Sequence, residues 1–126
     1  MGPGTGLGVG ILTKSKFANC HEVYPSEGGH TDFAVRGEED FKLRQFAIEY
    51  IKTSNNVENL RGKGEIDRVS IERMCAGPAV PLIYQFLKQE HPEVASPLGD
   101  KIAFDDMTSG DIIKAGMAKD DADPLC

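Results

Sequence analysis

The chain has 126 residues, of which 40% are hydrophobic and 27% charged, the composition of one ordinary globular domain. Its formal net charge of −6 and the lack of a visible basic patch argue against nucleic acid and anionic membrane surfaces as main partners. No apolar stretch reaches bilayer length, and the first residues do not have the pattern of a signal peptide, so we expect a cytoplasmic protein without membrane association.

The chain opens on a glycine-rich stretch, MGPGTGLGVGIL. We expect a turn over residues 2–8 and a hairpin whose strands cover residues 9–13 and 22–24, joined by residues 14–21. Alternating glycines let successive backbone N–H groups face one anion, and Thr5 adds a hydroxyl donor. The stretch lacks the Gly-Lys-Ser/Thr of a Walker A sequence, and it is followed by a strand, unlike a dinucleotide-binding turn. The stretch is compatible with a phosphate-binding hairpin tip or with a plain hairpin turn, and from the glycines alone the plain turn is favoured.

Residues 25–33, PSEGGHTDF, have the composition of a loop. Within them, two glycines separate Glu27 from His30 and favour a tight, exposed turn. A carboxylate accepts hydrogen bonds and an imidazole donates or accepts them, which is the mixture that a hydroxyl-rich ligand such as a sugar needs. The alternative is an ordinary polar turn in which His30 and Asp32 are satisfied locally.

The rest of the chain is predicted to be mainly helical. Apolar residues recur at helical spacing over residues 38–52, behind three acids that suit the start of a helix. Residues 53–66 are polar and interrupted by glycines, so we expect an exposed connection there. A short helix over residues 71–76 would be capped by Ser70 and ended by Gly77.

Two more helices are expected towards the end of the chain. One covers residues 79–90, with Val80, Ile83, Tyr84 and Leu87 on one face, and Pro92 stops it. The other covers residues 108–119, where Thr108 and Asp111 have the spacing of a capping box. Residues 93–106 form a mixed connection. Two or three strands are few for a complete α/β domain, so the chain has the pattern of part of a domain.

Glu72 lies in VSIERMCAG, a segment of mostly apolar character. A carboxylate there either pairs with a cation such as Arg68 or Arg73 or points into a site. From this segment alone, the surface ion pair is favoured.

The chain has three cysteines, Cys20, Cys75 and Cys126. Their count is odd, their spacing is wide and there is no Cys-x-x-Cys pair, so we expect reduced thiols. Cys20 and His21 are adjacent, which does not suit a zinc site, and no metal site is expected.

Taken in order, GPGTGLGVG, PSEGGHTDF and VSIERMCAGPAVPLIYQFL resemble the bacterial-type glucokinase family, ATP-dependent sugar kinases of the actin/hexokinase fold. The resemblance covers about residues 2–90, and residues 91–126 match more loosely. It implies an α/β chain, as an α+β fragment of the large lobe of an actin-like, ribonuclease H-like sugar kinase. The cysteine-rich zinc motif of the related repressor and kinase family does not occur, which places the chain nearer the zinc-free branch.

The resemblance also implies substrates and residue roles. The substrates are glucose and ATP, and phosphoryl transfer requires Mg²⁺. The residues implied to lie against the ATP phosphates are Gly4, Thr5 and Gly6. The residues implied to bond glucose hydroxyls are Glu27, His30 and Glu72.

Parts of the family's pattern do not occur in these residues: a first phosphate loop of Asp-x-Gly-Gly-Thr type, an Asn-Asp pair whose aspartate is the general base, and a later glycine-rich nucleotide segment. We therefore expect an internal fragment whose intact parent makes glucose 6-phosphate, while the isolated chain, without a catalytic residue, is inactive. The fragment would be a single partial domain over residues 1–126. Residues 2–35 would hold the glycine-loop hairpin and the sugar-binding loop, and residues 36–126 the mainly helical part.

Two alternatives stay open. One is a non-catalytic remnant or scaffold subunit that keeps the kinase fold, and the other is a small binding module without kinase ancestry. A homodimer is also left open for the intact parent.

Overall fold

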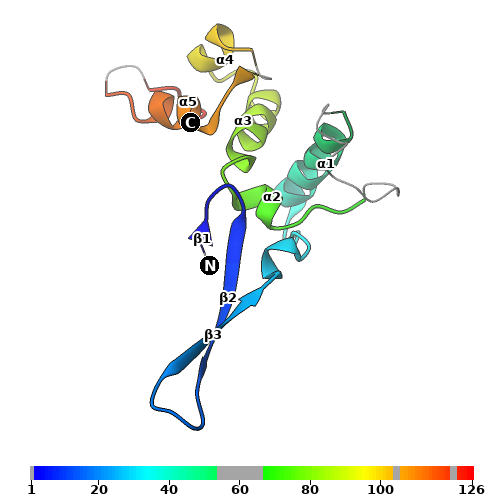
Figure 1. Ribbon diagram of the computed structural model, residues 1–126. Coiled ribbons are helices and arrows are strands. Elements are labelled where there is room, and N and C mark those ends of the chain that lie inside the picture. Colours follow the sequence, from blue (N-terminus) through cyan, green and yellow to red (C-terminus); the bar gives the residue numbers. More distant parts are fainter. Residues whose placement is uncertain (1, 54–66, 104–105, 120–121) are drawn as a thin grey trace.

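A computed structural model describes residues 2–53, 67–103, 106–119 and 122–126 (Figure 1). Its elements are β1 (Gly2–Pro3), β2 (Leu7–Lys14), β3 (His21–Ser26), the 3₁₀ helix η1 (Gly28–His30), α1 (Glu38–Thr53), α2 (Glu72–Cys75), α3 (Ala79–Glu90), α4 (Pro97–Lys101) and α5 (Ser109–Gly116). The chain therefore combines helices with a small antiparallel sheet, which is compatible with the expected α/β class.

The sheet has the order β1-β2-β3, and both pairings are antiparallel. The β2–β3 register runs from Val9 opposite Ser26 to Lys14 opposite His21, which confirms the predicted hairpin and lengthens both strands. The expected turn over residues 2–8 is wrong at both ends, because Gly2 pairs with Gly8 and Pro3 pairs with Leu7. The turn itself is confined to residues 4–6.

The β2–β3 hairpin projects away from the helices (Figure 1). Side chains on opposite faces of β2 are both exposed, Ile11 at 53% and Leu12 at 63%. Val23 on β3 is 71% exposed, and Phe17 in the connecting turn is fully exposed. Both faces of this ribbon are thus uncovered in the chain as described.

The main core lies where α1 meets α3 and the segment before α2. Its buried side chains are Ala47, Ile48, Ile51, Val69, Met74 and Leu82. The first three follow helical spacing along α1, so the amphipathic pattern over residues 38–52 correctly predicted this helix and its inner face.

A second, smaller core lies on the other side of α3, where Tyr84 packs with Met107 and Ile112 of the α5 region. The prediction that α3 buries a single face was wrong, since Leu82 and Phe86 are buried as well as Tyr84. The helix contacts α1 and α2 on one side and α5 on the other, so most of its circumference is covered.

A hydrogen-bond network at the second core fixes the end of the described chain. The buried hydroxyl of Tyr84 donates to Asp123 Oδ2 at 2.9 Å and is bonded to the hydroxyl of Ser96. Asp123 also accepts from the N–H groups of Leu98, at 3.0 Å, and Leu125, at 2.9 Å. This network joins α3, α4 and residues 122–126.

Three local predictions need correction. Ser70 does not cap a helix: α2 begins at Glu72, and Ser70 forms an extended bridge with Asp32. The connection expected over residues 93–106 contains α4, whose Pro97 at the first position favours a helix start. Helix α5 ends at Gly116, before the expected residue 119.

Other local predictions are confirmed. Helix α3 has the expected bounds, and Thr108 and Asp111 form the predicted capping box. Apart from these two predictions, Cys20, Cys75 and Cys126 form no disulfide in the described structure. Of the connection expected over residues 53–66, residues 54–66 lie outside the described residues. In the described part of the chain, no helix is both long and apolar enough to cross a bilayer.

Candidate functional site

A short antiparallel contact brings the loop after η1 against the segment before α2. Asp32 and Ser70 form the bridge, and it is flanked by two backbone bonds of 2.8 Å, from Phe33 N–H to the Val69 carbonyl and from Ile71 N–H to the Thr31 carbonyl. Continued by two residues, the same register sets residue 30 opposite residue 72. The pairing therefore brings His30 and Glu72, two of the three residues expected at the sugar site, opposite each other.

His30 lies between two carboxylates. Its Nε2 is 3.4 Å from Glu27 Oε2, and its Nδ1 is 3.9 Å from Glu72 Oε1. The exposed fraction of the side chain falls from 91% at Glu27 to 59% at His30 and 28% at Glu72. The three side chains thus form a row of hydrogen-bond acceptors and donors, exposed at Glu27 and partly buried at Glu72. Such a row suits a ligand carrying several hydroxyls.

The glycines of this segment serve close packing. Gly29 is buried, and a Cβ placed on it would lie 2.5 Å from the carbonyl oxygen of Leu7. A Cβ on Gly28 would lie 3.0 Å from a methyl group of Val9. The segment does form a tight turn, the 3₁₀ helix η1, but the expected exposure is wrong at Gly29, and no glycine in the ranges that the structure covers has a positive φ. The pair lets η1 lie directly on the start of β2.

Arg68 holds the loop that carries His30 by hydrogen bonds to Asp32 and to the backbone of His30. Its Nε donates to Asp32 Oδ1 at 2.6 Å, and its guanidinium also bonds the carbonyl of His30. The surface pair suggested between Glu72 and Arg68 is therefore wrong, because this cation is engaged with Asp32. The same bond holds Asp32 in a structural role beside the bridge.

The glycine turn is attached to α2 at both of its ends. Leu7 N–H donates to Glu72 Oε2 at 2.9 Å, and Gly77 N–H donates to the Gly4 carbonyl at 2.7 Å. Within the turn, Gly4 N–H donates to the Gly6 carbonyl at 2.8 Å. The N–H groups of Thr5 and Gly6 have no partner among the described residues, and Thr5 is exposed. These two amides and the Thr5 hydroxyl are donors that a phosphate could use.

Three contributors to this arrangement were missed by the sequence analysis: the N–H of Leu7, the side chain of Arg68 and the N–H of Gly77. The first and last are backbone groups, which carry no residue-type signal. Arg68 was noted only as a candidate partner of Glu72, and nothing in its local sequence indicates Asp32 instead.

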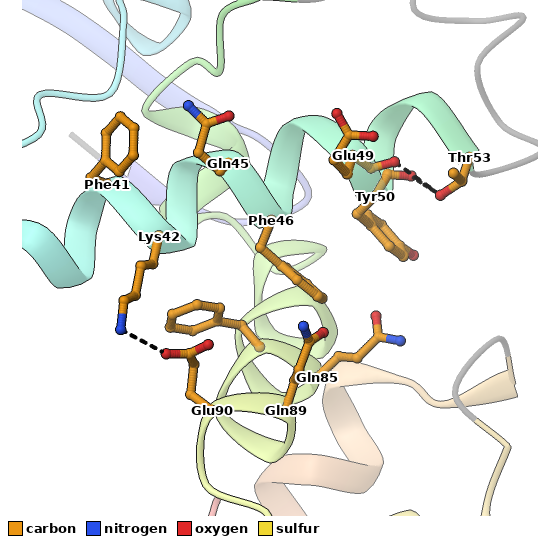
Figure 2. A pocket seen from close by; sticks show the side chains of 11 residues that line it. Phe41, Lys42, Gln45, Phe46, Glu49, Tyr50, Thr53, Gln85, Gln89 and Glu90 are labelled. Atoms are coloured by element: carbon orange, nitrogen blue, oxygen red, sulfur yellow. Dashed lines mark hydrogen bonds and ion pairs between the residues drawn. The ribbon is translucent and has the colours of Figure 1, made fainter.

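A separate groove lies between α1 and α3 (Figure 2). It has a volume of about 530 Å³, and two of its lining residues, Phe46 and Phe86, pack against each other with ring centroids 5.7 Å apart. An ion pair of 3.2 Å between Lys42 and Glu90 bounds it. None of the expected sugar or phosphate residues lines this groove. Across the described residues, no three His, Cys, Asp or Glu side chains gather as metal ligands would.

Comparison with known proteins relates the whole chain to one family. The family model described as "Glucokinase" matches residues 1–126. The chain is 41% identical over 97 residues to a glucokinase of Trichormus variabilis, an alignment that covers 77% of the chain and 24% of that protein. It is 33% identical over 102 residues to a glucokinase of Synechocystis, covering 81% of the chain and 25% of the relative.

A more distant relative is a "Probable glucokinase 2" of Trichomonas vaginalis, 28% identical over 116 residues, with 90% of the chain and 27% of the relative covered. The chain spans about a quarter of the length of the curated relatives it matches.

Proposed function

This chain belongs to the glucokinase family, and on that premise we propose that it forms part of an ATP-dependent kinase that phosphorylates glucose to glucose 6-phosphate. In this proposal Glu27, His30 and Glu72 bond glucose hydroxyls. The ATP phosphates lie against Gly4, Thr5 and Gly6.

One observation carries the proposal: a cluster of two carboxylates and an imidazole lies directly beside a glycine turn. Glu72 contacts both, since one of its oxygens is near His30 and the other accepts from the N–H of Leu7, the first residue after the turn. Phosphoryl transfer requires a hydroxyl acceptor and the phosphates of a nucleotide to meet in one place, and catalysis there is mainly positioning and charge stabilisation.

The donors of the turn fit a nucleotide phosphate. A Cβ on Gly4 would meet only the Gly6 carbonyl, at 3.9 Å, so the approach to the turn is open. The N–H groups of Thr5 and Gly6 would bind the phosphate oxygens. Mg²⁺ would enter with ATP and neutralise phosphate charge.

We further propose that the chain is part of a longer polypeptide, within the large lobe of an actin-like kinase. The uncovered faces of the β2–β3 ribbon and the share of each relative that is matched both support this. Residues 2–35 would carry the glycine-loop hairpin and the sugar-binding loop, and residues 36–126, the mainly helical part, would supply Glu72. Residues outside this chain would supply the general base, since Asp32 is held by Arg68.

The sugar role is tested by titrating glucose into the 126-residue chain and following binding by NMR. We expect Glu27→Gln and Glu72→Gln each to weaken glucose binding by about tenfold to a hundredfold, because a hydrogen bond to a charged group contributes about 1.5–3 kcal/mol. The matched control is Glu49→Gln on α1, an exposed carboxylate paired with Lys52 at 2.9 Å. Glucose binding that is as tight in both site variants as in the control would remove these residues from the site.

A further inference from the structure

The carboxylate of Glu72 has two separate sets of contacts. Oε1 lies 3.9 Å from His30 Nδ1 on the side where a sugar would bind. Oε2 accepts the N–H of Leu7 at 2.9 Å on the side of the glycine turn. The side chain is 28% exposed, so it reaches solvent on one side only. A single carboxylate thus connects the two halves of the proposed site.

The turn has little freedom to move independently of this carboxylate. A Cβ on Gly6 would lie 2.8 Å from Glu72 Oε2, so the turn backbone passes close beside the oxygen that holds it. The other end of the turn is fixed by the bond from Gly77 N–H to the Gly4 carbonyl. Glu72 is the first residue of α2, and Gly77 lies two residues beyond its end. Residues 72–77 therefore hold the turn by hydrogen bonds on both sides of Thr5.

We propose that Glu72 is a positioning residue that couples sugar binding to the conformation of the glycine turn. The inference rests on the proposed function and adds a role that sugar binding does not require. A sugar hydroxyl bonded to Oε1 restricts rotation of the carboxylate and so keeps Oε2 on the Leu7 N–H. The turn is then held with the Thr5 and Gly6 amides open to phosphate. By linkage, a nucleotide phosphate on the turn strengthens sugar binding by the same factor.

The test follows hydrogen exchange at the Leu7 amide by NMR in the 126-residue chain. Without ligand, we expect Leu7 to exchange about fivefold or more faster in Glu72→Ala than in the parent chain, with Glu72→Gln between them, because a neutral acceptor holds an N–H about half as strongly as a carboxylate. The amide of Ile48, buried in α1, should be unchanged in both variants and reports whether the fold is intact. Glu49→Gln is the matched control, since its carboxylate is exposed and pairs with Lys52 on α1 at 2.9 Å.

Glucose then separates the coupling from the proposed function. Saturating glucose should slow Leu7 exchange in the parent chain and in Glu49→Gln, but not in Glu72→Ala. Glucose that binds without any change at Leu7 would overturn the coupling and leave the sugar site standing. Leu7 exchange that is equally fast in the parent chain and in Glu72→Ala would overturn the positioning role, whether or not glucose binds. Failure of glucose to bind, with the Leu7 effect present, would contradict the proposed function alone.

Discussion

Replacing Gly29 with alanine should detach η1 from the start of β2. The added Cβ would lie 2.5 Å from the carbonyl oxygen of Leu7 and 3.2 Å from its Cβ. The first contact is with backbone, which cannot turn aside as a flexible side chain can. Because Gly29 does not have a positive φ, the effect is steric and carries no contribution from backbone strain.

The expected magnitude follows from that overlap. Inserting one methyl group into a tightly packed site destabilises a protein by about 1–3 kcal/mol. If the overlap is relieved by separation of η1 from β2, this corresponds to about a 5- to 150-fold loss of protection from hydrogen exchange in β2. The urea midpoint of the whole chain should fall in parallel, as followed by circular dichroism.

Gly37→Ala is the matched control for this prediction. No atom lies within 4 Å of a Cβ at Gly37, just before α1, so alanine there should be neutral or stabilise the chain by up to about 1 kcal/mol. The reasoning is refuted if Gly29→Ala and Gly37→Ala have the same hydrogen-exchange protection in β2 and the same urea midpoint. The close contact between η1 and β2 would then not be what holds the sugar-binding loop.

Three further predictions follow from the structure. Tyr84→Phe should destabilise the chain by about 1–3 kcal/mol in urea unfolding, because it removes the buried hydroxyl that is bonded to both Asp123 and Ser96; an unchanged midpoint would contradict this. Acid should loosen the α4–α5 end before α1. Burial alone would raise the pKa of Asp123, but hydrogen bonds from the N–H groups of Leu98 and Leu125 and from the Tyr84 hydroxyl hold this pKa below its usual range. The hydroxyl and N–H of Thr108 also lower the pKa of Asp111. Stability from a lowered carboxyl pKa is present above the ordinary value and lost below about pH 4, so exchange in α5 should rise there first, and earlier loss of α1 would refute it. The isolated chain should form no glucose 6-phosphate from glucose and Mg-ATP in a coupled assay; turnover abolished by Asp32→Asn would make it an enzyme in its own right.

The parts of the fold that were predicted from sequence are those coded locally. Helix α1 follows from a stripe of apolar residues behind three acids, and the start of α5 follows from Thr108 and Asp111, three positions apart. The hairpin was predicted from two short strand-like stretches on either side of residues 14–21. Each of these signals lies within one element, so packing with the rest of the chain did not override it.

The parts that were missed depend on contacts between distant segments. Ser70 has a good capping side chain, but its backbone is taken by the bridge to Asp32. The second buried side of α3 exists because α1 packs against Leu82 and Phe86 there, and the periodicity of α3 cannot show it. Within the site, residue types indicated sugar and phosphate binding, whereas the meeting of Glu72 with both His30 and Leu7 is set by the bridge.

The central proposal is that these residues supply a working sugar and phosphate site to a glucokinase. The direct test replaces the matching stretch of the Trichormus variabilis glucokinase with this chain's sequence and measures ATP-dependent formation of glucose 6-phosphate. We predict an active hybrid in which Glu72→Gln lowers kcat/KM for glucose by about tenfold or more, while Glu49→Gln leaves it unchanged. A hybrid that melts cooperatively but makes no glucose 6-phosphate, or one that is indifferent to Glu72→Gln, would contradict the proposal.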